Sequence, residues 1–188
     1  MKRQVRKSVF ETNSSSIHSL SIRKADSSDA IKKYMQDNGK TLNVKGDCFG
    51  WEFETYETPD KKLSYVYTLA CSYSWDEYLM MKEFMREALQ SAGFEPIFEE
   101  MKERKYSADG DSYVEPVQRN SWDVCIDHSE CLESFAHDIF SDKNLMLSFI
   151  FNEGSFILTG NDNVSENREL GSYAPKEYED SLNYYKGN

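Results

Sequence analysis

The chain lacks the long apolar runs and the targeting signals that would place it in a membrane or outside the cell. No apolar stretch approaches the roughly 18 residues that a membrane-spanning helix needs. The basic N-terminus is followed by Val-Phe-Glu-Thr rather than by the apolar segment of a secretory signal. We therefore expect a cytoplasmic protein with no membrane partner.

The chain also lacks the short motifs that identify common enzyme classes. It contains no G-x-S-x-G elbow, no Walker loop with its lysine, no H-E-x-x-H and no G-x-G-x-x-G. The sequence Asp109-Gly110-Asp111 is without the spaced carboxylates and the closing glutamate of an EF-hand loop. No catalytic class can be assigned from a motif, and the sequence does not decide whether the protein is an enzyme.

Cysteine is scarce and scattered. The four cysteines are Cys48, Cys71, Cys125 and Cys131, and no two of them form a C-x-x-C pair. This spacing argues against a zinc ribbon. Because cytoplasmic cysteines are usually reduced, we expect four ordinary buried thiols.

Positive charge is in deficit, and the deficit is unevenly placed. The net charge is −11, from 22 basic and 33 acidic residues. Residues 1–50 hold ten basic and five acidic residues, which leaves 12 of the 22 basic and 28 of the 33 acidic residues for the rest. This balance disfavours direct binding of nucleic acid. It fits ordinary solubility, the simpler interpretation, or an acidic surface that competes with nucleic acid for a basic protein.

Groups that can donate, accept or move protons are concentrated between Glu11 and Ser21. This stretch holds a carboxylate, an amide, six hydroxyls and an imidazole. Hydroxyl and amide side chains bond to nearby backbone, so residues 12–16 should form a turn. The following strand, residues 17–22, should place His18, Leu20 and Ile22 on one face.

Two interpretations of this stretch remain open. It is either a buried turn with a core histidine whose hydrogen bonds are satisfied, or the wall of a pocket for an anion or a metal. The candidate catalytic residues under the second interpretation are Glu11, Asn13, Ser14, Ser15, Ser16 and His18.

Two later polar turns could join this stretch if the first and last hairpins share one sheet. Asp127 and His128 are expected where a strand hands over to a helix capped by Ser129, a location that favours anions. His18, His128 and either Asp127 or Asp162 would then form a site with two histidines and one carboxylate for a divalent metal. The candidate anion-binding residues are Ser129, Asn161 and Asn163. The structural alternative is that Asp127 only caps the helix.

The N-terminal stretch also carries a resemblance. The run Val-Phe-Glu-Thr-Asn-Ser-Ser-Ser-x-His-Ser, within residues 8–20, resembles the opening motif of an uncharacterised family of small proteins from bacteriophages and their low-GC Gram-positive hosts. Residues 126–129 and 155–163 fit the same pattern. The resemblance implies a phage or prophage origin, and no established activity comes with it.

The order of the expected elements predicts an α+β fold, because strands and helices do not alternate as βαβ units. We expect a mainly antiparallel sheet built from hairpins at 8–22, 41–55 and 149–159, with a strand at 122–126 added. Three main helices at 59–73, 75–92 and 129–140 should cover it. Residues 1–164 would form one domain. Residues 165–188 would be a polar tail, either with a short helix near 176–184 or disordered.

Two functional hypotheses follow. The first is a metal-dependent hydrolase that acts on a phosphoester or a nucleotide. The second is an acidic, non-enzymatic protein that binds and inhibits a host factor, either a defence component or a nucleic-acid-binding protein. The sequence predicts no oligomeric state.

Overall fold

The computed structural model describes residues 16–50, 54–99, 105–106, 113–114, 124–127, 132–161 and 182–187, and the statements below concern this part of the chain. Its elements in chain order are β1 (Ser16–Arg23), α1 (Ser28–Asn38), β2 (Thr41–Val44), β3 (Cys48–Phe49), β4 (Glu54–Tyr56), α2 (Pro59–Cys71), α3 (Trp75–Ser91), β5 (Glu95–Phe98), β6 (Lys105–Tyr106), β7 (Tyr113–Val114), β8 (Cys125–Ile126), α4 (Glu133–Ile139), α5 (Lys143–Phe151), β9 (Phe156–Asn161) and β10 (Leu182–Gly187).

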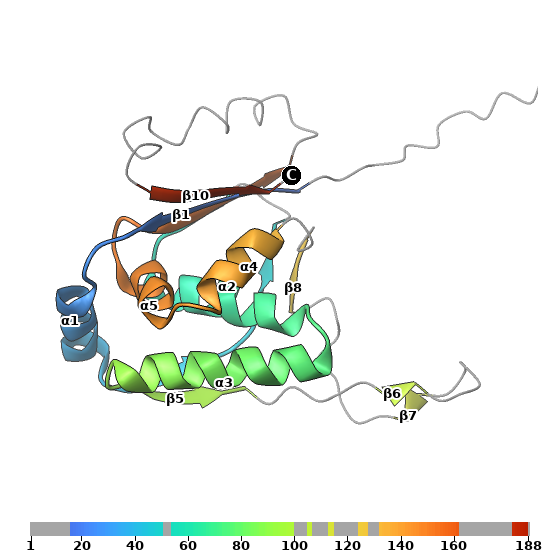
Figure 1. Ribbon diagram of the computed structural model, residues 1–188, viewed down its shortest axis with the longest axis horizontal. Coiled ribbons are helices and arrows are strands. Elements are labelled where there is room, and N and C mark those ends of the chain that lie inside the picture. Colours follow the sequence, from blue (N-terminus) through green and yellow to red (C-terminus); the bar gives the residue numbers. More distant parts are fainter. Residues whose placement is uncertain are drawn as a thin grey trace, which may run out of the picture.

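The fold is α+β, as predicted, and its largest sheet is antiparallel. Four strands follow the order β10-β1-β9-β4, so that the strands expected at 17–22 and 155–159 share one sheet. The first part of the hairpin expected at 8–22, residues 8–15, lies outside the described residues. Strand β1 pairs with β9 from Ser16 opposite Asn161 to Ser21 opposite Phe156. It pairs on its other edge with β10, from His18 opposite Gly187 to Arg23 opposite Leu182. Figure 1 shows β1 and β10 side by side at the top of the molecule.

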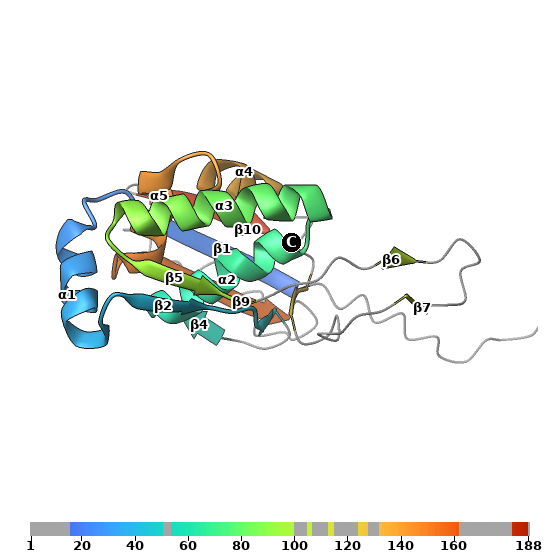
Figure 2. The ribbon, with the colours of Figure 1, turned by 90° about the horizontal axis from the view of Figure 1, so that it is seen from below.

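Helix α2 occupies the centre of the fold. Its residues 62–70 are all buried, so the helix is covered on every side rather than along one stripe. Pro59 is its first residue, where a missing N–H costs no hydrogen bond. In Figure 1, α2, α4 and α5 lie between the four-stranded sheet and α3, and in Figure 2, seen from below, α2 lies in front of β1. The core is therefore formed between the sheet and α3, with α2 in its middle.

Helix α3 has a start and a stop that its sequence encodes. Ser74 and Glu77 form a capping box, in which each side chain bonds the other residue's backbone N–H. The helix ends before Gly93, whose φ of 92° is a left-handed conformation that glycine adopts without steric cost. The expected helix over 75–92 is confirmed. None of the helices within the described residues is long and apolar enough to cross a membrane.

The expected hairpin at 149–159 is wrong in its first half. Residues 149–151 are the last turn of α5, and only β9 is a strand. Residues 146–151 are all buried. A short, fully buried apolar run has the same pattern in a helix and in a strand, so periodicity could not separate the two.

The hairpin expected at 41–55 consists of three short strands with separate partners. Strands β2 and β3 pair in parallel with β5 and β8, and only β4 joins the main sheet, beside β9. Of the strand expected at 122–126, residues 122 and 123 lie outside the described residues, and β8 pairs with β3 rather than with the main sheet. In the tail, residues 182–187 form β10, where the sequence predicted either a short helix near 176–184 or disorder. Residues 176–181 lie outside the described residues.

Candidate functional site

His18 lies on the inner face of the main sheet and is completely buried. Its Nδ1 is 3.0 Å from the hydroxyl oxygen of Tyr65 on α2. Its Nε2 is 2.7 Å from the main-chain carbonyl oxygen of Asp127, a residue 109 positions away that follows β8. The imidazole thus connects the sheet, the central helix and the end of β8.

The two contacts determine which ring nitrogen of a neutral imidazole carries the hydrogen. A carbonyl oxygen can only accept, so Nε2 donates to Asp127. Nδ1 then accepts from the hydroxyl of Tyr65. Both ring nitrogens of His18 are therefore engaged in hydrogen bonds inside the core. A metal or a substrate that bonded either nitrogen would have to replace one of these two hydrogen bonds.

Gly50 forms one wall of the histidine pocket. Its φ is 113°, and a Cβ built on it would lie 3.0 Å from His18 Nε2 and 3.0 Å from Asp127 Cβ. The chain after β3 consequently passes against the imidazole with no room for a side chain. Tyr65 is packed edge-to-face against Phe49 and Phe135, with ring centroids 5.0 and 6.5 Å apart. The pocket is tight and largely aromatic.

The structure brings together parts of all three polar turns that the sequence singled out. Ser16 and Asn161 are opposite one another at the end of the β1–β9 pair. Two residues further along β1, His18 is opposite Thr159 and bonded to Asp127. The remaining candidates, Glu11, Asn13, Ser14, Ser15, His128, Ser129, Asp162 and Asn163, lie outside the described residues. Within the residues that are described, no group of three or more histidine, cysteine, aspartate or glutamate side chains is arranged to hold a metal.

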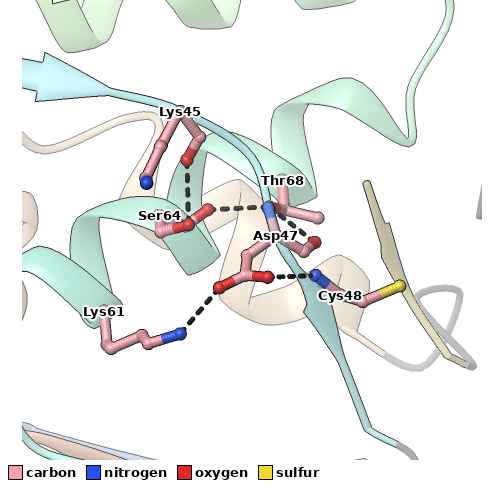
Figure 3. Close-up of polar contacts among 6 residues, drawn as sticks. All are labelled: Lys45, Asp47, Cys48, Lys61, Ser64 and Thr68. Carbon is pink, nitrogen blue, oxygen red and sulfur yellow. Dashed lines mark hydrogen bonds and ion pairs between the residues drawn. The ribbon is translucent and has the colours of Figure 1, made fainter. Parts of the chain in front are cut away.

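A second polar cluster, which the sequence did not indicate, holds residues 45–48 against α2 through hydrogen bonds and an ion pair (Figure 3). Asp47 Oδ2 is 2.7 Å from Lys61 Nζ, and Asp47 Oδ1 accepts from the N–H of Cys48 at 3.0 Å. The N–H of Asp47 donates to Thr68 Oγ1 at 3.0 Å, and Ser64 Oγ donates to the carbonyl oxygen of Lys45 at 2.8 Å. The segment leading into β3 is therefore held at both its backbone and its side chain.

The carboxyl of Asp47 is kept ionised by this cluster. Burial alone would raise its pKa. The hydrogen bonds from Lys61 and from the Cys48 N–H, together with the charges of Lys61 and Lys45, more than offset burial and hold the pKa below its ordinary value.

Two further features have no local signal in the sequence. Cys48 and Cys125 are 77 residues apart and their Sγ atoms are 2.7 Å from one another. Lys62 is a fully buried lysine whose amine donates to the carbonyl oxygens of Asn152 and Ser155, each at 2.8 Å. Desolvation lowers the pKa of Lys62 to about 8, although Glu57 and Glu153 act in the opposite direction. Both features depend on which distant segments pack together.

A comparison of the chain with protein-family models, with curated proteins and with solved structures finds no match.

Proposed function

We propose that this protein is an acidic, non-enzymatic interaction protein of phage or prophage origin that binds and inhibits a basic host factor. The partner would be a protein with a nucleic-acid-binding surface, such as a nuclease of host defence. The two proteins would bind one another in the bacterial cytoplasm. The observation that carries the proposal is the complete burial of His18 with both ring nitrogens bonded. This arrangement supports a structural role for the imidazole of the richest polar stretch.

The charge of the chain supports an electrostatic partner. The net charge is −11, and the described part contains exposed carboxylates that form no ion pair with another described residue. Six of them are Asp37, Glu54, Glu57, Asp76, Glu95 and Glu133. Carboxylates without a counter-ion of their own can accept the lysines and arginines of a partner, and their field steers its approach.

The test is capture of host proteins on the immobilised protein from a nuclease-treated lysate of a low-GC Gram-positive bacterium. We expect a basic protein to be retained at about 0.1 M salt and released at about 1 M, where the Debye length falls from about 10 to about 3 Å. The purified partner should then lose its nucleic-acid binding or cleavage when the protein is added in equimolar amount.

A matched variant separates charge from shape. Replacing the six carboxylates with their amides (Asp→Asn, Glu→Gln) removes charge without removing any ion pair among the described residues, so the fold should persist. The circular dichroism spectrum of the amide variant should match that of the wild type, but the variant should no longer retain the partner. Retention of the same partner by the amide variant, or equal retention at high salt, would contradict the proposal.

A second candidate function is a metal-dependent phosphoester hydrolase, and one observation favours it. Asp127 reaches His18 across 109 residues, and His128 and Asp162 adjoin Asp127 and Asn161 in sequence. Metal analysis of untagged protein and hydrolysis of a model phosphodiester test it. His128→Ala should abolish both metal binding and hydrolysis, whereas His137→Ala, at an exposed position of α4, should change neither. Equal effects of the two replacements would remove this candidate.

A further inference from the structure

Cys48 and Cys125 are directly opposite one another on neighbouring strands. Strands β3 and β8 are parallel, and Cys48 is the registered partner of Cys125. Their Sγ atoms are in contact, at 2.7 Å, and share a hydrogen bond. Both residues are partly exposed, so small molecules can reach them.

The strand geometry suits a covalent link between the two residues. Neighbouring strands are about 4.8 Å apart, and the Cα atoms of disulfide-bonded cysteines are usually about 4.4–6.8 Å apart. A bridge between Cys48 and Cys125 would therefore need little movement of the backbone.

The segments that carry the two thiols are held in place. The N–H of Asp47 donates to Thr68 Oγ1, and Lys61 Nζ donates to the Asp47 carboxylate; together these bonds fix the entry to β3 on α2 (Figure 3). On the other strand, Val124 packs so closely on Gly46 that a Cβ at Gly46 would clash with it. Neither cysteine has to be brought to the other by a large motion.

We propose that Cys48 and Cys125 form a dithiol site that is oxidised reversibly to a disulfide by exchange with small-molecule disulfides such as oxidised glutathione. One thiolate attacks a sulfur of the small disulfide, which releases one small thiol and leaves a mixed disulfide. The second protein thiol loses its proton and attacks the protein sulfur of that intermediate, which releases the second small thiol. The protein loses two electrons and two protons, and the small disulfide gains them.

The contact between the two sulfurs prepares the ring-closing step. Whichever thiolate attacks the small disulfide first, the other protein sulfur is already in contact with it and can close the ring. Burial and the hydrogen bond with Cys125 raise the pKa of Cys48 to about 12, so the exchange should become faster as the pH rises.

The disulfide would act on the histidine pocket. Cys48 is followed by Phe49 and Gly50, which pack against Tyr65 and His18, and two residues after Cys125 comes the carbonyl of Asp127 that bonds His18. Oxidation would join the two strands that flank this pocket and restrict their separation. The site is independent of the proposed interaction function.

The experiment treats the reduced, folded protein with oxidised glutathione, blocks the remaining thiols with iodoacetamide and maps the peptides without reduction. We expect a peptide pair linked through Cys48 and Cys125 and a protein mass lower by two hydrogen atoms. The melting temperature should rise by at least about 5 °C, because the link closes a long loop, and should return on treatment with dithiothreitol.

Controls separate this pair from the other thiols. The Cys71→Ser, Cys131→Ser double variant should behave as the wild type, and Cys48→Ser should end as a stable mixed disulfide with glutathione. Alkylation of both Cys48 and Cys125 in the treated wild type would overturn the proposal. A lasting glutathione adduct on either residue of the wild type would also overturn the proposal. The same holds for a disulfide that leaves the melting temperature unchanged. The wild-type peptide map decides the outcome even where a serine variant fails to fold.

Discussion

Replacing Lys62 with methionine should change how the stability of the protein depends on pH. Lys62 is fully buried and its amine contacts two carbonyl oxygens, and no ion pair with a carboxylate is found for it among the described residues. Desolvation lowers its pKa from 10.5 to about 8 in the folded protein. Methionine has a similar length and no charge, so Lys62→Met removes the titrating group and retains most of the packing.

The sign follows from proton binding in the two states. Between pH 8 and 10.5 the unfolded chain keeps a proton on this amine that the folded protein has lost, so stability rises with pH. The lowered pKa corresponds to a penalty of about 3 kcal/mol at pH 7, since one unit is about 1.4 kcal/mol. The penalty falls to about 1.4 kcal/mol at pH 9.5. The wild type should therefore gain about 2 kcal/mol relative to Lys62→Met between pH 7 and pH 9.5.

The absolute stability of Lys62→Met at pH 7 reflects two opposing effects of similar size. The variant escapes the penalty for the buried charge, but it removes the amine that donates to the carbonyls of Asn152 and Ser155. The Asn152 carbonyl still accepts from the N–H of Ser155, whereas a buried carbonyl left unpaired costs about 1–3 kcal/mol. The informative quantity is thus the pH dependence of the difference between the two proteins. Groups common to both, such as the thiol of Cys48, cancel in that difference.

Urea denaturation followed by circular dichroism at pH 7, 8, 9 and 9.5 measures the difference. Lys40→Met, which removes an exposed positive charge, reports the part due to net charge alone. A difference between wild type and Lys62→Met that stays constant within about 0.5 kcal/mol over this range would refute the reasoning.

Three further replacements test the local structure. Gly50→Ala should destabilise the protein by about 3 kcal/mol, against about 1 for Gly39→Ala, because both have positive φ but only the new Cβ at position 50 meets His18; equal losses in thermal denaturation would contradict the tight pocket. His18→Ala should cost about 3 kcal/mol, through the cavity and the lost partner of the Tyr65 hydroxyl; a melting temperature equal to that of the wild type would show that the histidine is not structural. Ser74→Ala should lower the free energy of unfolding by about 1 kcal/mol through loss of the capping box, and an unchanged urea midpoint would argue against the cap.

The inward position of His18 could be predicted because strand alternation depends only on the period of the backbone. His18, Leu20 and Ile22 are all fully buried, as expected. Ser19 and Ser21 on the other face are buried too, which alternation could not indicate. That face is covered through tertiary contacts, and local sequence carries no information about them.

The partners of His18 could not be predicted for a similar reason. Tyr65 is one of nine successive buried residues of α2, and nothing in the sequence distinguishes it as the one that meets the imidazole. The meeting of Cys48 with Cys125 depends on a parallel pairing of two-residue strands, which are too short to show a pattern. The helix starts at Pro59 and Ser74, in contrast, follow from interactions within one turn and could be read directly.

The place of β1 in the sheet has a consequence for synthesis of the protein on the ribosome. Strand β1 is the earliest described strand to be translated, yet its two neighbours, β9 and β10, are among the last. The nascent chain must keep this strand with both hydrogen-bonding edges unsatisfied until residues 156–187 have been made. Contacts between such distant segments close slowly, and unpaired edges invite association with other chains. The yield of folded protein should therefore depend on temperature and on chaperones more than the small size of the chain would suggest.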